Sequence, residues 1–552
     1  MASLNPLSGP LGHRRAAHLL RRACFRFDRA KVDEWAAKSA GEALADLLAA
    51  RPLRVPQPLY AASAAATPVT WINPPQAPTA PLPTDDGDLK RYVMAWWVNE
   101  ALHDPGIGHR MQSFFHQFLT VSADSGSSAQ FFDYLGLLRW GCLGNLKTLV
   151  TKMIVDNCML NYIDNNQNFF QNPNENYARE FFELHTIGRG EPAGPGDYTT
   201  YTEEDIVEAA RVLTGFNNAP RHLYLDPDTQ LPAGKPYPQS HDFGEKKFSA
   251  RFAGTSITTN TKDADGMRGE LNALVDMVFA QEETARNFCR RLYHFFVSRK
   301  LTPEIETDVI APLAQTLKNG NFEIKPALEQ LLQSEHFFDA DDSDNADEIV
   351  GALIKSPLDL ALQALSFFSV PIPDPIGDNL THYKTFYNGG VLERMLARAG
   401  MELFYPPDVA GYPGYYQDPD FNRQFFNSAT IIARYKLPQM LLNGSVSWTG
   451  AADAPIGTKL DAAKWLKESG VVSDPSDSYV LVKELLEYTF PEPPDSERFI
   501  YFLDTIFLDK LPPGDWTYEW ENYLQTGNDS EVSIPLGRLL TALMYAPEYQ
   551  LM

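Results

Sequence analysis

The stretch Asn172-Pro-Asn-Glu-Asn-Tyr-Ala-Arg-Glu-Phe-Phe-Glu-Leu-His-Thr-Ile-Gly188 carries its own start and stop signals. Asn172 can cap a helix, Pro173 suits the first helical position, and Glu175 stands where a capping-box acid belongs. Gly188 suits the left-handed residue that closes a helix. The spacing therefore predicts a helix that begins after Asn172 and ends at Gly188.

Four polar residues of this helix share one face. At about 100° per residue, Asn176, Arg179, Glu180 and Glu183 fall in one narrow arc, while the opposite arc is apolar except for His185. A ridge with two acids, a base and an amide can form a site. It can equally be a solvated face on which Arg179 pairs with Glu183 four residues later. Both interpretations stay open at this point.

Composition sets the broad class of the protein. The chain has 552 residues, of which 44% are hydrophobic and 12% aromatic, so it can bury a large core. The 47 basic and 71 acidic residues give a net charge of −24. This balance argues against nucleic acid or an anionic membrane surface as the main partner, and it tolerates cationic ligands or divalent metals.

Cysteine spacing and hydropathy exclude several further classes. Cys24, Cys142, Cys158 and Cys289 are far apart and form no C-x-x-C pair, which is unlike a zinc ribbon or a disulfide-dense scaffold, although one or two disulfides are compatible with it. No window of 18 uncharged apolar residues predicts a transmembrane helix. The first 24 residues lack the apolar segment of a signal peptide.

Helical periodicity dominates the chain and predicts a mainly α fold with long loops. We expect N-terminal helices in residues 1–51 and a Pro-rich connector in 52–87, because nine prolines lie between positions 52 and 83. A helical core follows in 88–338, and a C-terminal helical part in 349–552 packs on it. Within the core, Thr202-Glu-Glu-Asp205 predicts the start of a helix through a capping-box-like pattern. Residues 217–258 break the helical rhythm and predict a small irregular or β flap.

Several motifs along the chain carry a family resemblance. They are, in order, Phe115-His-Gln-Phe118, Asn174-Glu-Asn-Tyr-Ala-Arg-Glu180 with Glu183-Leu-His185, Tyr201-Thr-Glu-Glu-Asp205, Arg211-Val-Leu-Thr-Gly-Phe216, His241-Asp-Phe-Gly-Glu-Lys-Lys-Phe248, Leu403-Phe-Tyr-Pro-Pro-Asp-Val-Ala-Gly-Tyr-Pro-Gly414 and Ala546-Pro-Glu-Tyr-Gln550. Together they resemble the bacterial domain-of-unknown-function family 1800 over nearly the whole chain. Where many relatives carry a second histidine this chain has Phe118, and where many carry tryptophan it has Tyr412.

The resemblance implies little about activity, because the role of the family is unknown. It implies that members are often exported to the periplasm or cell surface, and that their genes often lie beside genes for a sulfatase-like companion family. An envelope-associated protein is therefore expected.

The candidate metal ligands come from three segments. Glu180 and Glu183 are three residues apart on one helix, so their carboxylates can reach one point. His116, between aromatic residues, could complete a carboxylate and imidazole set for a divalent metal. The remaining candidate ligands are His185, His241 and Asp242. For His185 the alternative is a core side chain bonded to a backbone carbonyl, for His116 it is a buried imidazole with a carboxylate partner, and for His241-Asp242 it is an ordinary turn with Asx bonding.

The leading hypothesis is a metal-assisted enzyme with a Glu- and His-lined cleft. In it Glu180 and Glu183 hold a cation or act as general acid and base, Arg179 orients an anionic group and Asn176 binds substrate. The alternative is a non-enzymatic envelope binding or assembly protein that works with the sulfatase-like partner. A third possibility is polysaccharide binding through the aromatic turn Tyr405–Tyr416, which could also be a structural Ω-like loop. No P-loop, G-x-S-x-G or H-E-x-x-H motif is present.

Overall fold

The computed structural model describes residues 2–49, 56–72, 82–195, 197–341, 349–448 and 454–552. Within these ranges the fold is mainly α, as the periodicity predicts. The strands are short and form two-stranded antiparallel sheets: β1 Pro192–Gly194 with β2 Asp197–Tyr198, β3 Phe216–Asn217 with β4 Lys235–Pro236, β5 Lys246–Lys247 with β6 Ser256–Ile257, and β7 Ser445–Val446 with β8 Ala454–Pro455.

The α-helices of the first part of the chain include the one that carries the predicted ridge, α9. They are α1 Gly12–Ala23, α2 Arg29–Ala36, α3 Ala40–Leu47, α4 Asp86–His103, α5 Gly108–His116, α6 Ser128–Gly141, α7 Leu146–Ile154, α8 Asn157–Tyr162, α9 Glu175–Glu180 and α10 Glu203–Val212. Thr202 caps α10 through a complete capping box with Asp205, which confirms the start predicted for that helix.

The remaining α-helices run from the middle of the chain to its end. They are α11 Ala264–Phe279, α12 Glu282–Phe296, α13 Pro303–Ile305, α14 Ala311–Asn319, α15 Ile324–Leu332, α16 Pro357–Phe367, α17 Pro413–Tyr416, α18 Thr430–Tyr435, α19 Leu437–Asn443, α20 Ala462–Ser469, α21 Ser478–Thr489, α22 Ser496–Ile500, α23 Pro513–Thr526 and α24 Ser530–Tyr545.

Wider and tighter helical turns extend or connect these helices. The π-helical segments are η3 Phe181–His185, η6 Glu306–Ile310, η7 Thr381–Leu396 and η10 Tyr501–Phe507. The 3₁₀ turns are η1 Ala123–Ser125, η2 Asn165–Gln167, η4 Pro238–Ser240, η5 Ala250–Phe252, η8 Ala397–Ala399, η9 Phe421–Phe425 and η11 Pro547–Gln550. Because π-helical turns are rare and often mark functional sites, η3, which continues the predicted ridge, is of particular interest.

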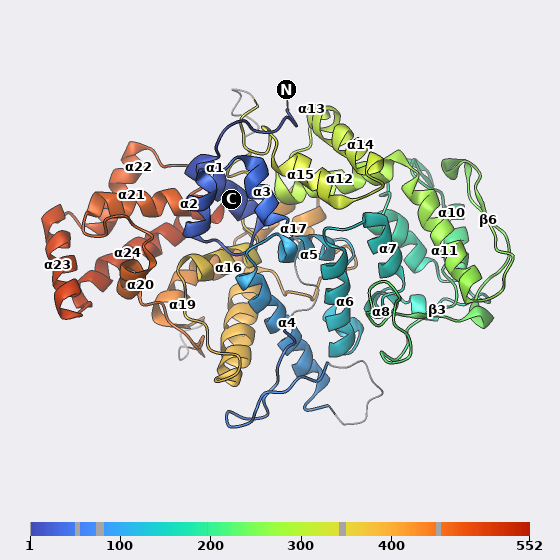
Figure 1. Ribbon diagram of the computed structural model, residues 1–552, viewed down its shortest axis with the longest axis horizontal. Helices are drawn as coiled ribbons and strands as arrows, with labels where there is room; N and C mark the ends of the chain where they lie inside the picture. Colours follow the sequence, from blue (N-terminus) through green and yellow to red (C-terminus); the bar gives the residue numbers. More distant parts are fainter. Residues whose placement is uncertain (1, 50–55, 73–81, 196, 342–348, 449–453) are drawn as a thin grey trace.

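The molecule is elongated in the view of Figure 1. Helices α20 to α24 occupy one end and the flap with α10, α11, β3 and β6 occupies the other. The N-terminal helices lie between them, beside α15, and Leu7 N donates to Gln333 O at 2.8 Å. The chain start is thus held against a helix more than 300 residues away in sequence, by backbone bonding that composition does not reveal.

One hydrophobic core runs through all of these parts. Its buried residues extend from Ala2 to Tyr549, and it joins the predicted core segment 88–338 to the C-terminal part 349–552. Where the two parts meet, the buried Arg110 guanidinium bonds to Asp359 and lies 4.7 Å from the centroid of the Phe295 ring. The four cysteine thiols are all buried and the described residues contain no disulfide. Within those residues, every helix is too short or too polar to span a bilayer.

The Pro-rich connector is described only in part, since residues 52–55 and 73–81 lie outside the described ranges. Its described section folds back on itself, because Tyr60 and Val69 form a β-bridge with N–O distances of 2.8 and 2.9 Å. Trp96 Nε1 of α4 donates to Pro56 O at 2.6 Å and fastens the section to the core. The predicted flap at 217–258 is present as the β3–β4 and β5–β6 pairs.

Candidate functional site

The ridge helix starts two residues later than the sequence predicts. Asn174, not Asn172, is the N-cap, and its Oδ1 accepts from Asn176 N at 3.0 Å. Bonds to the preceding loop select this cap, because Asn174 N donates to Asn168 Oδ1 at 2.9 Å and its side-chain amide donates to Asp164 O at 3.2 Å. The helix ends earlier than predicted, at His185, while Gly188 has the left-handed backbone that the sequence predicts, with a φ of +80°.

The helix changes character in the middle of the ridge. It is α-helical to Glu180 and π-helical from Phe181 to His185. A π turn holds more residues than an α turn, so the ridge does not continue at the α-helical angle on which its arc was predicted. Glu180 is therefore the last α-helical residue, and Glu183 projects from the wider turn.

Arg179 and Asn176 are both occupied by structural bonds. The Arg179 guanidinium donates twice to the Glu203 carboxylate, at 2.8 Å for each bond, and so ties α9 to α10. The Glu203 bond raises the pKa of Arg179. The Asn176 side-chain amide donates to Ile163 O at 3.2 Å. The pairing of Arg179 with Glu183 that a solvated ridge suggested is replaced by this bond to the next helix.

Glu180 and Glu183 are the two acids of the ridge. Both are half-buried, and the Tyr201 hydroxyl donates to Glu183 Oε1. Burial, followed by the negative charge of Glu183, raises the pKa of Glu180 to about 7. Arg179 acts in the opposite direction and Asp408 in the same direction as Glu183. Glu180 is thus a carboxyl group that can give or accept a proton near neutral pH.

Asp408 comes from the aromatic turn Tyr405–Tyr416, far away in sequence. Its Oδ2 accepts from the Tyr416 hydroxyl at 2.9 Å, and its backbone oxygen accepts from the Tyr162 hydroxyl at 3.1 Å. Tyr162 ends α8, so these bonds fasten the turn close to the ridge. The described structure therefore brings two of the family-like motifs together.

Most aromatic rings of the turn face the core. Tyr412 is buried and its hydroxyl donates to Glu402 O at 2.5 Å. The Tyr415 ring stacks on Phe295 with 5.7 Å between the centroids. Gly411 has a φ of +92°, and a Cβ there would lie 2.9 Å from Gln117 O. These contacts are those of a structural loop that packs on α5, the alternative considered for this segment.

His116 and His185 are both buried away from strong polar partners. His116 Nδ1 bonds to the Tyr134 hydroxyl at 2.9 Å, and its Nε2 has no partner among the described residues. Burial lowers the pKa of His116 to about 3. Burial, with the Arg291 charge second, lowers the pKa of His185 to about 3 as well. Both imidazoles are neutral at physiological pH and are unsuited to proton transfer there.

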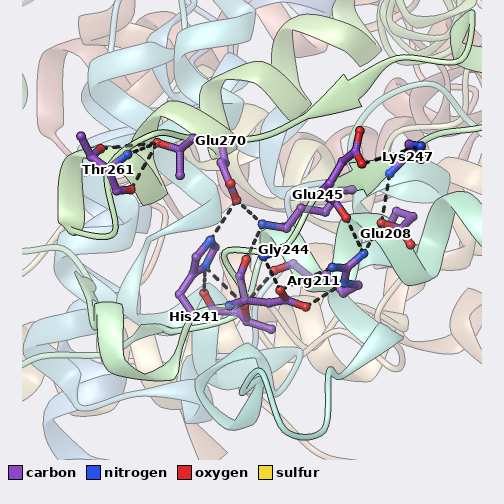
Figure 2. Close-up of polar contacts among 12 residues, drawn as sticks. Glu208, Arg211, His241, Gly244, Glu245, Lys247, Thr261 and Glu270 are labelled. Atoms are coloured by element: carbon purple, nitrogen blue, oxygen red, sulfur yellow. Dashed lines mark hydrogen bonds and ion pairs between the residues drawn. The ribbon is translucent and has the colours of Figure 1, made fainter.

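His241 and Asp242 belong to a separate polar cluster, which Figure 2 shows. His241 Nε2 bonds to Glu270 Oε2 at 2.9 Å, and the Lys246 ammonium bonds to the same oxygen. These three side chains are fully buried. Asp242 accepts from Arg211 Nε at 2.7 Å and from Gly244 N at 2.7 Å, the second bond being an Asx turn.

The cluster explains two family-like motifs at once. Burial is the largest influence on the pKa of Asp242 and tends to raise it, but the bonds from Arg211 and Gly244 and the charges of Arg211 and Lys246 together lower it. Burial lowers the pKa of Lys246 although the Glu270 bond opposes it. The His-Asp-x-Gly-x-Lys segment and Arg211 thus bind each other and α11 in the interior. With no solvent access to His241, Lys246 or Glu270, the cluster holds the flap on the core.

The six predicted metal ligands do not gather at one point. Glu180 and Glu183 are neighbours, whereas His116 bonds to Tyr134, and His241 and Asp242 bond to Glu270 and Arg211. No group of three or more His, Cys, Asp or Glu side chains placed to hold a metal ion occurs among the residues that the structure describes.

Sequence reasoning missed Tyr201, Glu203 and Asp408 as parts of the ridge site. Tyr201 and Glu203 flank the capping residue Thr202, so the helix-start signal drew attention to capping alone. Asp408 lies in the aromatic turn, where the rings were the feature that stood out. The motifs that contain these residues were recognised, but their mutual contact depends on the tertiary fold.

The protein is mainly α-helical, and its candidate site is the pair of Glu180 and Glu183, where the helix changes from α to π. Helix α10, through Glu203, and the aromatic turn, through Asp408, lie beside this pair. The chain belongs to the family described as protein of unknown function (DUF1800), whose model matches residues 18–551. No curated protein and no solved structure matches the chain.

Proposed function

We propose that the protein is an acid–base enzyme in which Glu180 transfers the proton. The observation that carries the proposal is the half-buried carboxyl of Glu180 beside Glu183 and Asp408, which has a pKa of about 7. General acids and bases work best when their pKa lies near the working pH, and enzymes raise carboxyl pKa values by burial and like charge. Both causes act on Glu180.

The neighbouring residues would divide the remaining tasks. Tyr201 holds one oxygen of Glu183, so the Glu183 carboxylate is fixed in orientation beside Glu180. Arg179, held by Glu203, places a positive charge near both acids without being released to a ligand. A carboxyl group whose pKa is raised, placed beside a second carboxyl group, is an arrangement in which an acid and a base can act on one substrate.

The test compares the wild type with Glu180→Gln in an assay that does not require the substrate to be known in advance. Each protein is incubated with a bacterial metabolite extract, and changes in the extract are measured by mass spectrometry. We expect products that form with the wild type and with Glu204→Gln, but not with Glu180→Gln. Glu204 is the matched control, because it is an exposed acid on α10.

Identical extract profiles for the wild type and Glu180→Gln, with the variant folded, would contradict the proposal. When a product is found, its rate should fall as the pH drops through 7 if Glu180 is the base, and rise if Glu180 is the acid. The direction therefore assigns the role of the group.

The divalent metal remains a separate proposal. Glu180 and Glu183 supply carboxylate oxygens of the kind that hard cations prefer. Elemental analysis of the wild type and of Glu180→Gln decides the matter: a metal held at a one-to-one ratio by the wild type and lost in the variant supports a metal-assisted reaction. A ratio that the substitution leaves unchanged places any metal elsewhere.

The family resemblance carries the second candidate, an envelope-associated assembly protein that works with a sulfatase-like companion. A pull-down from cells that express both proteins distinguishes the two functions. A stoichiometric partner that is retained by Glu180→Gln, in a protein without Glu180-dependent turnover, supports assembly. The inward packing of Tyr412 and Tyr415 weighs against polysaccharide binding through the aromatic turn.

A further inference from the structure

A cavity of about 240 Å³ lies between α5, α12 and the segment that contains α17 and η9. These helices are neighbours near the middle of the molecule in Figure 1, where α5, α12 and α17 are labelled close together. The side chains that decide its chemistry are Gln117, Arg291, His294, Arg299, Phe421 and Asn422. Glu180 and Glu183 do not line this cavity, so the inference goes beyond the function proposed above.

The cavity is rich in positive charge in a protein whose net charge is −24. Arg291 has no carboxylate partner among the described residues, and its guanidinium lies over the Phe118 ring, 4.7 Å from the centroid. Burial lowers the pKa of Arg291 to about 10, so the group is still charged at neutral pH. Within the described structure, Arg299 Nη1 donates a hydrogen bond to Pro419 O at 3.5 Å.

Other charged groups of the cavity wall are paired with an opposite charge, unlike Arg291 and Arg299. Arg290, one position earlier on α12, bonds to Glu306 at 2.5 Å and also to Glu283. Asp359 is the carboxylate that lines the cavity, and it is occupied by Arg110 and by Ser356. The half-buried cations at Arg291 and Arg299 are therefore not paired with a carboxylate among the described side chains around them, and both can meet an anion in the cavity.

Two amide side chains add unused hydrogen-bonding capacity. Asn422 is 8% exposed, and neither its Nδ2 nor its Oδ1 has a partner among the described residues. Gln117, also 8% exposed, donates to Ser113 O at 2.9 Å, but its Oε1 has no partner within the same ranges. Buried polar atoms are nearly always bonded in native proteins, so unused donors and acceptors on one cavity wall indicate that something else binds them.

The rest of the wall is aromatic. The Phe421 ring stacks on His294 with 4.3 Å between centroids and 23° between the planes. Phe295 and Tyr415 stack at 5.7 Å, and Phe118 underlies Arg291. Burial lowers the pKa of His294 to about 4, so this ring is a neutral flat surface at physiological pH. Such walls suit an apolar or aromatic body more than a hydrated inorganic ion.

We infer that this cavity binds a small organic anion, in which a carboxylate or phosphate faces Arg291 and Arg299, an amide-like group meets Gln117 and Asn422, and an apolar body lies against the phenylalanine rings. Each part of the ligand matches one feature of the wall: the anion matches the two cations, the amide-like group matches the two amide side chains, and the apolar body matches the rings. An acylated amino acid has all three parts, and an aryl phosphate has the anion and the apolar body. The shared chemistry is an anion on an apolar body.

The experiment is a binding titration with defined probes. N-acetyl-L-phenylalanine, phenyl phosphate and the uncharged N-acetyl-L-phenylalaninamide are titrated into the full chain by calorimetry and by ligand-observed NMR. We expect at least one anionic probe to bind and the amide to bind at least roughly tenfold more weakly, because a charge-assisted bond is lost. The tighter of the two anions identifies the carboxylate or the phosphate as the preferred group.

Variants locate the site. Arg291→Met should weaken the anionic probe by roughly tenfold or more, since it removes the charge and keeps an apolar stem over Phe118. Asn422→Leu should weaken N-acetyl-L-phenylalanine more than phenyl phosphate. The matched control is Arg286→Met, on the same helix but paired with Glu282 at 3.7 Å and outside the cavity wall, and it should bind like the wild type.

The inference is overturned if neither anionic probe binds at about 10 mM, a concentration that detects even weak affinity. It is also overturned if Arg291→Met binds as tightly as the wild type. Should Arg291→Met fail to fold, phenylglyoxal modification of the wild type replaces it: the bound probe should protect Arg291 and leave Arg286 reactive, and equal modification of Arg291 with and without the probe counts against the site.

Discussion

Arg179 and Glu203 form a two-bond ion pair, in which the Nη1 and Nη2 atoms of Arg179 each donate to one carboxylate oxygen of Glu203 at 2.8 Å. The pair joins α9 to α10 and keeps a positive charge beside Glu180. The pKa of Glu180 is consequently a balance: burial, Glu183 and Asp408 raise it, and Arg179 lowers it. This balance can be disturbed from either side.

Substitutions of the two neighbours should move the pKa of Glu180 in opposite directions. Glu183→Gln removes a like charge and should lower that pKa, whereas Arg179→Gln removes an opposite charge and should raise it further. The pKa can be followed by NMR of carbon-labelled glutamate side chains, with the Glu180 signal assigned through Glu180→Gln. Glu204→Gln is the control and should leave the titration unchanged. Shifts of the same sign in both variants would contradict the electrostatic account.

The stability of the protein should depend on pH through Glu180. Its folded pKa is about 7 against an ordinary value of 4.5, so the folded state binds more protons between these values and the free energy of unfolding falls as the pH rises through that window. Glu180→Gln removes the penalty. Because the group is partly exposed, we expect the variant to be more stable than the wild type by only about 1–2 kcal/mol at pH 8.

The same comparison at pH 4 supplies the control. There Glu180 is protonated in both states, so the wild type and Glu180→Gln should unfold at nearly the same denaturant concentration. A stability difference of equal size at pH 4 and pH 8 would show that the substitution acts through packing and not through ionisation.

Glu270 should be critical for holding the flap. Glu270→Gln leaves the buried Lys246 ammonium without its counter-charge, and breaking a buried pair costs about 3–5 kcal/mol. A lower thermal midpoint and faster proteolysis within 217–258 would show this. The double variant Glu270→Leu with Lys246→Met should be less destabilised than Glu270→Gln, because no lone charge stays buried. The exposed pair of Glu245 and Lys247 gives the control, and Glu245→Gln should unfold at the same temperature as the wild type.

Gly411 should tolerate no side chain. Its φ of +92° and the 2.9 Å approach of a Cβ to Gln117 O predict that Gly411→Ala lowers the free energy of unfolding by about 1–3 kcal/mol. Gly537 is the contrasting case, since it lies inside α24 with nothing within 4 Å of a Cβ. Gly537→Ala should therefore stabilise by about 0.5–1 kcal/mol. Urea unfolding of both variants checks the two signs together.

Local signals in the sequence predicted much of the fold. The helical class, the flap at 217–258 and the capped start of α10 are confirmed, and Gly188 has the predicted left-handed backbone although the helix ends at His185. These features depend on spacing and on residues next to each other. The cap of α9 was placed two residues too early, because Asn172 and Asn174 are equally good capping residues and the bond to Asn168, six residues earlier in the preceding loop, selects the second.

The candidate site could be predicted only in part. Glu180 and Glu183 were found because they share a helix, and helical spacing is a local property. Their environment was not predictable, since Tyr201, Glu203 and Asp408 reach the ridge through the fold. His241 was proposed as a metal ligand, but in the interior its imidazole bonds to Glu270, which lies 29 residues later in the chain.

The sequence by itself determined the helical class, the family and the two acids of the ridge, because periodicity, capping and motif order are written in neighbouring residues. The tertiary structure alone decided which charges are paired and which are not. It bonded Arg179 to Glu203, enclosed Glu270 with Lys246, and left Arg291 in a cavity without a carboxylate partner among the described residues. The physical reason is that burial and the distance between charges, which set pKa values and binding, depend on contacts between residues far apart in the chain.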